Sequence, residues 1–143
     1  MSKRILVPIG RPDDAEALLA AVADLARGAG ATVRLLHVMP TPVTVMAPRG
    51  HVVAYANQLV DGLESRGLAR LDAARAILDG VPVECAVRFG DVADEIVEEA
   101  ETFGADVIAL HARRRRWWNG LKLGGVARRV ARRAKSAVLV LAC

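Results

Sequence analysis

Four consecutive arginines followed by two tryptophans form the segment of this chain whose side chains are best suited to bind a ligand. The run is Arg113–Arg116, with Trp117 and Trp118 directly after it and Gly124-Gly125 a few residues further on. A guanidinium group is planar and permanently charged, and it binds phosphate or carboxylate through two parallel hydrogen bonds. Glycines before a helix let backbone N–H groups approach an anion closely. The segment therefore favours capture of an anionic ligand.

Other uses of the same segment stay open. In the simplest alternative the arginines are solvated and the tryptophans pack on the protein or on a second copy of it. Nucleic-acid binding would combine basic groups with aromatic stacking, but no recognised nucleic-acid motif accompanies them, so nucleic acid is not the expected partner. A role at a membrane surface needs a continuous amphipathic helix, which Asn119-Gly120 interrupts.

The remaining reactive side chains form no catalytic or metal-binding pattern. The three histidines have no metal-ligand spacing, and we expect His37 to be packed and His111 to be hydrogen-bonded in a structural role. Cys85 is expected to act as a small hydrophobic residue, and the terminal Cys143 has no activating neighbour. No serine lies in a nucleophile elbow and no phosphate-loop lysine is present. We therefore expect a binding protein rather than an enzyme, without a metal.

Charge is distributed unevenly along the chain. Residues 1–106 carry 10 Lys/Arg and 16 Asp/Glu, whereas residues 107–143 carry 10 Lys/Arg and no acid. Such asymmetry favours an anionic small molecule, an acidic protein partner, or a second copy that presents its acidic surface. A solvated basic loop and helix face is the alternative.

The composition predicts a cytoplasmic protein. Hydrophobic residues make up 53% and charged residues 25% of the 143 residues, which excludes a disordered chain. No apolar run approaches the roughly 20 residues that cross a bilayer, and the first residues lack the pattern of a signal peptide. Two cysteines make no disulfide framework, which is consistent with a reducing compartment.

Short apolar segments alternate with segments of helical periodicity, which predicts an α/β protein with a mostly parallel sheet and helices on both faces. The predicted strands cover residues 5–9, 32–39, 81–89, 106–110 and 137–142. Helices are predicted after Asp13, from about residue 52 to 78, from Gly90-Asp91 to Gly104, and along Val126, Val130 and Ala134. Ligands bind beyond the carboxyl ends of the strands in such sheets.

Several local features are also predicted. Asp13 is placed as the N-cap of the first helix, because Glu16 follows at the spacing of a capping box. The core-facing stripe of this helix is Leu18, Leu19, Val22, Leu25 and Ala26. Clean alternation along residues 81–89 and Pro82 near their start predict a strand at the sheet edge, and residues 111–123 are predicted to form a loop.

Five sequence pieces, in order, resemble the universal stress protein family almost end to end. They are Lys3–Pro8, Leu35–Val38, Gly90–Ile96 with Gly104–Ile108, Gly124-Gly125-Val126, and Ala137–Leu141. The resemblance implies one domain over residues 1–143. It also implies a Rossmann-like, adenine nucleotide alpha hydrolase-like sheet with strand order 3-2-1-4-5.

Members of this family that bind ATP carry Gly, two residues, Gly, nine residues, Gly, then Ser or Thr. The corresponding positions here are His111, Arg114, Gly124 and Gly125, so one glycine of three is kept and the hydroxyl is lost. Those relatives also place Asp, which contacts adenosine, where this chain has Gly10. Ordinary ATP binding is therefore not expected, and no other cofactor is implied.

The resemblance implies a regulatory, stress-response binding protein, and the alternative is a nucleotide binder with at most slow hydrolysis. Backbone groups of Val38 could still meet an adenine edge. The candidate site for an anion or nucleotide comprises Gly10, Arg11, Val38, His111, Arg113, Arg114, Gly124, Gly125 and Val126.

The last predicted strand, residues 137–142, favours a homodimer. It is apolar on both faces, and the family's strand order places it at an edge of the sheet. An uncovered apolar edge strand pairs readily with another strand, and no proline, inward charge or bulge prevents this here. We expect two copies to pair through this strand about a two-fold axis.

Overall fold

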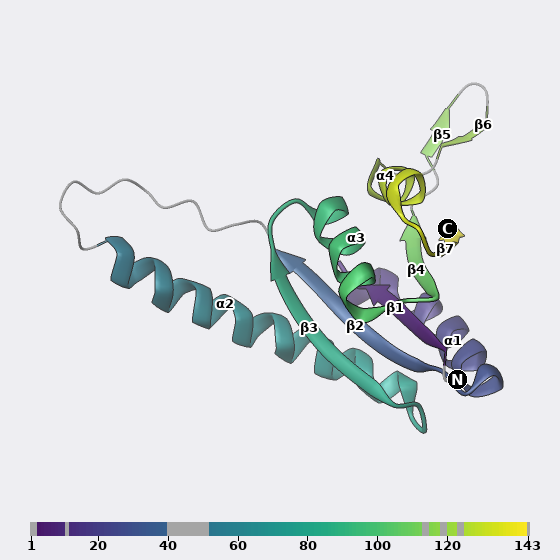
Figure 1. Ribbon diagram of the computed structural model, residues 1–143, viewed down its shortest axis with the longest axis horizontal. Helices are drawn as coiled ribbons and strands as arrows, with labels where there is room; N and C mark the ends of the chain where they lie inside the picture. Colours follow the sequence, from purple (N-terminus) through teal and green to yellow (C-terminus); the bar gives the residue numbers. More distant parts are fainter. Residues whose placement is uncertain are drawn as a thin grey trace.

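Five parallel strands form the central sheet of the computed structural model, which describes residues 3–10, 12–39, 52–112, 115–117, 120–122 and 125–142 (Figure 1). Their order across the sheet is β3-β2-β1-β4-β7, as expected from the resemblance. The bounds are Arg4–Pro8 for β1, Thr32–Met39 for β2, Val83–Phe89 for β3, Val107–Ala112 for β4 and Ala137–Ala142 for β7. The predicted edge positions of β3 and β7 are confirmed.

Helices cover both faces of this sheet. Figure 1 shows α1 and α2 on one face and α3 and α4 on the other. Their bounds are Pro12–Ala29 for α1, Val52–Arg75 for α2, Val92–Phe103 for α3 and Gly125–Arg133 for α4, with a 3-10 turn, η1, at Ala76–Leu78. Among the helices described, none has the length and apolarity that a bilayer crossing requires.

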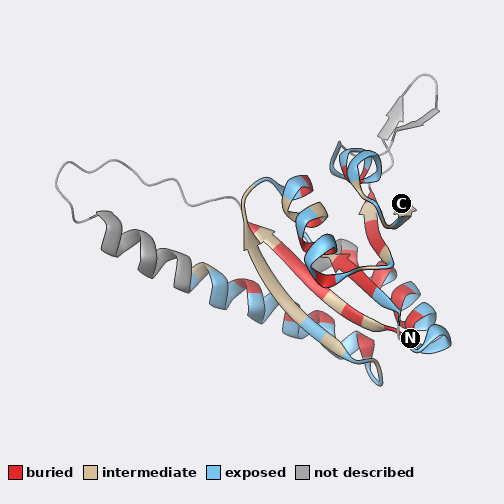
Figure 2. Cartoon of the chain, viewed as in Figure 1, coloured by how far each residue is buried: buried red, intermediate tan, exposed pale blue. Residues whose placement is uncertain are grey.

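The inner strands supply side chains to two separate cores. Ile5 and Val7 of β1 pack beneath α1 and α2, whereas Leu6 packs beneath α3 and α4. Successive strand residues point to opposite faces, and so an uninterrupted apolar run is suited to a strand covered on both sides. Figure 2 shows this as buried inner strands between helices whose outer surfaces are exposed.

The ends of α3 match the sequence prediction. The Asp91 side chain accepts a hydrogen bond from the backbone N–H of Asp94 at 3.1 Å, which satisfies one of the free donors of the first turn. Gly104 closes the helix in the left-handed conformation, with φ of 71°, and its N–H donates to carbonyls of the last turn.

The predicted start of α1 is wrong. The helix begins at Pro12, so Asp13 lies within its first turn rather than before it. Proline suits the first helical position because the N–H that it lacks would have no partner there. Leu25 is also not a core residue, because it is 43% exposed. The buried arc of α1 is centred near Val22 and Ala26, and Leu25 lies at its margin.

Two predictions for the C-terminal third also need correction. Val126 does not face the core that α4 covers. It is 37% exposed, and Ala127 and Val130 are buried instead. Residues 111–123 are not wholly a loop, since β5 at Arg115–Trp117 and β6 at Gly120–Lys122 pair antiparallel. Asn119-Gly120 is a sequence signal for a turn nearby, although Gly120 itself belongs to β6 and pairs with Trp117.

Candidate functional site

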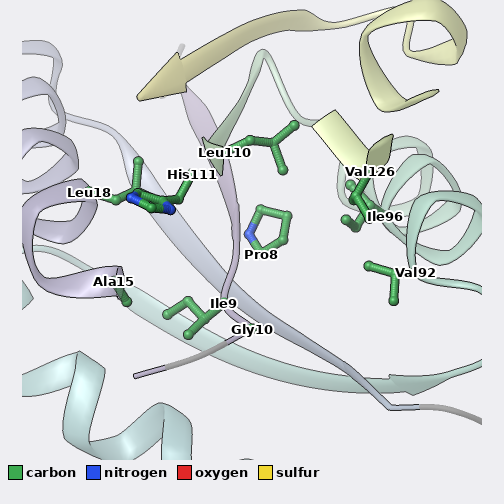
Figure 3. Close-up of a pocket in the computed structure, with 10 residues that line it drawn as sticks. All are labelled: Pro8, Ile9, Gly10, Ala15, Leu18, Val92, Ile96, Leu110, His111 and Val126. Carbon is green, nitrogen blue, oxygen red and sulfur yellow. The ribbon is translucent and has the colours of Figure 1, made fainter. Parts of the chain in front are cut away.

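A hollow of about 270 Å³ lies where β1 and β4 end beside one another. From this point the sheet continues to β2 on one side and to β7 on the other, so the strand order reverses here. Parallel sheets covered by helices bind ligands at such a switch point. Figure 3 shows the lining residues, which are Pro8, Ile9, Gly10, Ala15, Leu18, Val92, Ile96, Leu110, His111 and Val126.

Gly10 follows the end of β1 and leaves its side of the hollow without a side chain. The N–H of the preceding Ile9 donates to the carbonyl of Leu36 at 2.7 Å, which holds this end of the chain against β2. A Cβ atom added to Gly10 would meet no other atom within 4 Å. Packing therefore does not demand glycine at this position, and a larger residue would fit.

His111 is the polar side chain among the described lining residues. It lies near the end of β4, opposite Leu141 of β7 in register, and it is partly buried. No hydrogen bond from its ring is formed within the described part of the chain, so the structural bond expected of it is not seen there. His37 differs, because it is buried and its Nδ1 lies 2.8 Å from the carbonyl oxygen of Ile9. The packed role predicted for His37 is confirmed.

The first turns of α3 and α4 supply the other side of the hollow. Val92 and Val126 are 38% and 37% exposed, although both are large and apolar. Ion pairs hold the two helices together at this end, with Arg129 Nη2 2.7 Å from Asp91 Oδ2 and Arg133 bound to Asp94. The carboxylate of Asp91 thus already occupies the N-terminus of α3.

An ionic cluster fixes α3 on the sheet behind the hollow. Glu99, 5% exposed, accepts a hydrogen bond from Arg34 of β2 at 2.9 Å and one from Arg88 of β3 at 2.6 Å. Glu84 and Glu95 bind the same two arginines, at 2.6 Å each. The guanidinium of Arg34 also stacks 4.2 Å from the ring centre of Phe103.

The arginines of this cluster stay charged. Burial works against the charged form of Arg34, but hydrogen bonds and the negative charge of Glu84 and Glu99 outweigh it, so the pKa of Arg34 is raised. Burial also works against the charged form of Arg88, but its hydrogen bonds to Glu95 and Glu99 and their negative charge outweigh burial, so the pKa of Arg88 is also raised. In the sequence, the local signal of this cluster is the spacing of Glu95 and Glu99, which places both on one helix face.

A smaller hollow of about 150 Å³ lies between α1 and α2 and shares Ile9, Gly10 and Ala15 with the first. His37 and the charged residues Glu16 and Arg70 contribute to its wall. Among the described residues, no group of three or more His, Cys, Asp or Glu side chains is arranged to hold a metal ion.

The structure brings together Gly10, His111 and Val126 of the candidate residues. Val38 instead lies opposite Arg88 in the β2–β3 register and packs on the α3 side of the sheet, and Gly125 begins α4 without lining the hollow. The other four candidates lie outside the described residues; they are Arg11, Arg113, Arg114 and Gly124.

Comparison with known families identifies the chain. The sequence model of the universal stress protein family matches residues 1–142. The chain belongs to the universal stress protein family. A search of curated proteins gave no match to this universal stress protein.

Solved structures share the fold of this universal stress protein over nearly its whole length. The hypothetical protein MJ0577, a test case for structure-based assignment of biochemical function, is 26% identical with a TM-score of 0.80, covering 100% of this chain and 97% of that one. A universal stress family protein from Burkholderia pseudomallei is 25% identical, with a TM-score of 0.70 and coverages of 97% and 95%. The Archaeoglobus fulgidus universal stress protein in complex with dAMP is 21% identical, with a TM-score of 0.65 and coverages of 98% and 97%.

Proposed function

We propose that this universal stress protein is a cytoplasmic regulatory protein that binds a small anionic ligand, without catalysis, in the hollow between β1 and β4. The wall of that hollow carries the proposal. Gly10 provides no carboxylate for a ribose, and His111 is the polar side chain among the described lining residues. Among the described lining residues, His111 is the one side chain that could pair with a nucleoside's hydroxyl groups, and a buried hydroxyl group without a partner is unfavourable.

The basic C-terminal third supports an anionic ligand. Residues 107–143 contain no acid, and Arg113 follows His111 by two positions in the sequence. Arginine is the side chain best suited to bidentate binding of carboxylate or phosphate. Arg113 and Arg114 are therefore proposed to contribute to binding, together with Arg11, which follows Gly10 directly.

A nucleotide is the second candidate ligand, because the Archaeoglobus fulgidus protein of the same fold was solved with dAMP. Calorimetry with Mg-ATP distinguishes the two. We expect a Kd no tighter than about millimolar, or about 4 kcal/mol of binding free energy, for the unmodified protein. The variant Gly10→Asp should bind about tenfold more tightly, since it restores a charged hydrogen-bond acceptor.

The control for this change is Gly62→Asp, because Gly62 also has open space around it but lies on α2, away from the hollow. It should leave ATP affinity unaltered. Micromolar binding of ATP by the unmodified protein would contradict the proposal and establish the nucleotide alternative. Adenylate retained through gentle purification, detected by mass spectrometry, would lead to the same conclusion.

Anion binding is tested by thermal unfolding in phosphate or sulfate. A bound anion raises the melting temperature by mass action on the native state. Changing Arg113 and Arg114 together to Ala should remove most of that rise. The paired control changes Arg128 and Arg132 of α4 to Ala, two exposed arginines that do not line the hollow. If both double variants lose the same part of the rise in melting temperature, the anion acts by general charge screening and not at a specific site.

We also propose that two copies pair through β7. The strand lies at the sheet edge, and its Leu139 side chain is 44% exposed. Edge pairing would satisfy the free backbone groups of both strands and cover this side chain.

A further inference from the structure

We propose that the ligand of the β1–β4 hollow is a small monocarboxylic acid with an apolar body. This inference rests on the proposed function, namely that the hollow is a binding site, and adds the chemical class of the ligand. Three properties of the hollow carry it: the side chains of the wall, their arrangement, and the volume.

The described wall is almost wholly apolar. Leu18 of α1, Ile96 of α3 and Leu110 of β4 are buried at its base, and Pro8 and Ile9 close it from β1. An apolar wall excludes groups that need several hydrogen bonds, because each buried polar group without a partner is costly. A sugar or a phosphorylated nucleoside is therefore a poor fit, whereas a hydrocarbon or aromatic body is a good one.

Val92 and Val126 strengthen this reading. They are the large apolar side chains left exposed on α3 and α4, and both lie at the same hollow. Each helix buries its next residue, Ala93 or Ala127, against the sheet, so the valines are not needed for that core. Exposed apolar groups that converge on a cavity are typical of a binding site for an apolar ligand.

The polar side chain of the described wall lies on one side of the hollow. Figure 3 shows His111 beside Leu18 on one side of the cavity, and Val92, Ile96 and Val126 on the opposite side. A ligand with one polar end fits this arrangement when that end lies at His111 and its body lies between α3 and α4. The basic sequence after His111 favours a negative end.

The volume limits the size of the ligand. About 270 Å³ is slightly below the range of about 300 to 1,000 Å³ that ligand pockets span. A hollow of this volume suits a small ligand body rather than a whole nucleotide. Hexanoate and benzoate are acids of this size and serve as probes.

Calorimetry on the full chain tests the proposal with hexanoate, benzoate, butyrate, hexanol, benzyl alcohol, AMP and inorganic phosphate. We expect hexanoate and benzoate to bind at least about tenfold more tightly than the matching alcohols, AMP or phosphate. A tenfold difference in Kd corresponds to about 1.4 kcal/mol of binding free energy. Butyrate should bind more weakly than hexanoate by about fourfold for each methylene group that it lacks. A chain-length dependence of this kind requires an apolar cavity.

Two variants locate the site. Val126→Glu places a charge at the mouth and should weaken hexanoate binding at least about tenfold. Ala131→Glu, an exposed position on the same helix that does not line the hollow, should leave it unchanged. His111→Phe keeps an aromatic ring but removes the hydrogen bond that the imidazole is proposed to form with the carboxylate of the ligand. It should bring acid and alcohol within about twofold of each other while alcohol affinity is kept.

The outcomes separate this inference from the function on which it rests. Tighter binding of AMP than of either acid overturns the carboxylate class and supports the nucleotide alternative. Phosphate binding that equals hexanoate binding and is insensitive to Val126→Glu overturns the apolar acid but keeps an anion-binding protein. If none of the probes binds the folded protein, both proposals are wrong.

Discussion

Gly67 lies where α2 passes close to β2 and β3. A Cβ atom at this position would overlap Cε of Met39 and lie 3.0 Å from Cγ2 of Val87. We expect Gly67→Val to lower the free energy of unfolding by about 1 to 3 kcal/mol, since added carbons must displace both neighbours. Gly62→Val is the control, because the same atoms would enter open space. Urea unfolding measures both, and equal effects would show that the approach at Gly67 is not tight.

Cys85 shows how burial acts on the pKa of a titrating group. Desolvation on the apolar side of β3 raises the pKa of its thiol, with smaller effects from Arg75 and Asp72. When the folded pKa lies above the unfolded value, the thiol of the unfolded chain ionises first. The free energy of unfolding is therefore unaffected by Cys85 at neutral pH and falls as the pH rises past about 8.5. Urea unfolding between pH 7 and 9.5 should show a steeper decline for the unmodified protein than for Cys85→Ala. Parallel declines would contradict this.

At the scale of the element, α3 is attached to the β2–β3 half of the sheet by ion pairs as well as by apolar packing. Glu99 is shared by Arg34 and Arg88, each 24% exposed, so removal of this one carboxylate leaves two partly buried charges less well compensated. Breaking a buried ion pair costs about 3 to 5 kcal/mol, and the exposure of the arginines reduces the expected value for Glu99→Gln to about 2 to 3 kcal/mol.

The control for Glu99→Gln is Glu101→Gln on the same helix. Glu101 is 56% exposed and its Oε1 lies 3.9 Å from Nζ of Lys135, a surface pair of the kind that contributes about 0 to 1 kcal/mol. Chemical denaturation of both variants should therefore separate them by at least about 1 kcal/mol. A loss of stability for Glu99→Gln no larger than the control would show that the cluster is dispensable to the fold.

At the scale of the whole molecule, the β7 edge decides the assembly. Leu139 shares a strand face with Leu141 and is 44% exposed, whereas Val138 and Val140 pack on the α3–α4 side. Leu139→Lys should therefore convert the proposed homodimer into a monomer without damage to the core. Val140→Pro is a second probe, which blocks strand pairing but also removes a side chain packed on the α3–α4 side.

Light scattering at micromolar concentration measures this assembly. We expect twice the chain mass of 15.2 kDa for the unmodified protein and for Leu25→Lys, a control that alters an equally exposed leucine on α1. The Leu139→Lys variant should give the mass of one chain. A monomer already present in the unmodified protein would mean that β7 is not the site of pairing.

The class of fold follows from local patterns in the sequence. An apolar run such as Ile5–Val7 has side chains for both faces of a sheet, and Asp91 and Gly104 mark the ends of α3 with residues chosen by backbone geometry. Family resemblance supplied the strand order. The predicted loss of glycines and a hydroxyl group from the ATP-binding motif rests on the same resemblance.

Only the tertiary structure decided which residues meet. Leu25 and Val126 follow helical periodicity, yet both are exposed, since periodicity gives the face of a helix but not where its covering layer ends. Arg34 and Glu99 are 65 residues apart, and no local pattern predicts their 2.9 Å contact. The hollow at Gly10 and His111 likewise arises because β1 and β4 become neighbours only when the sheet assembles.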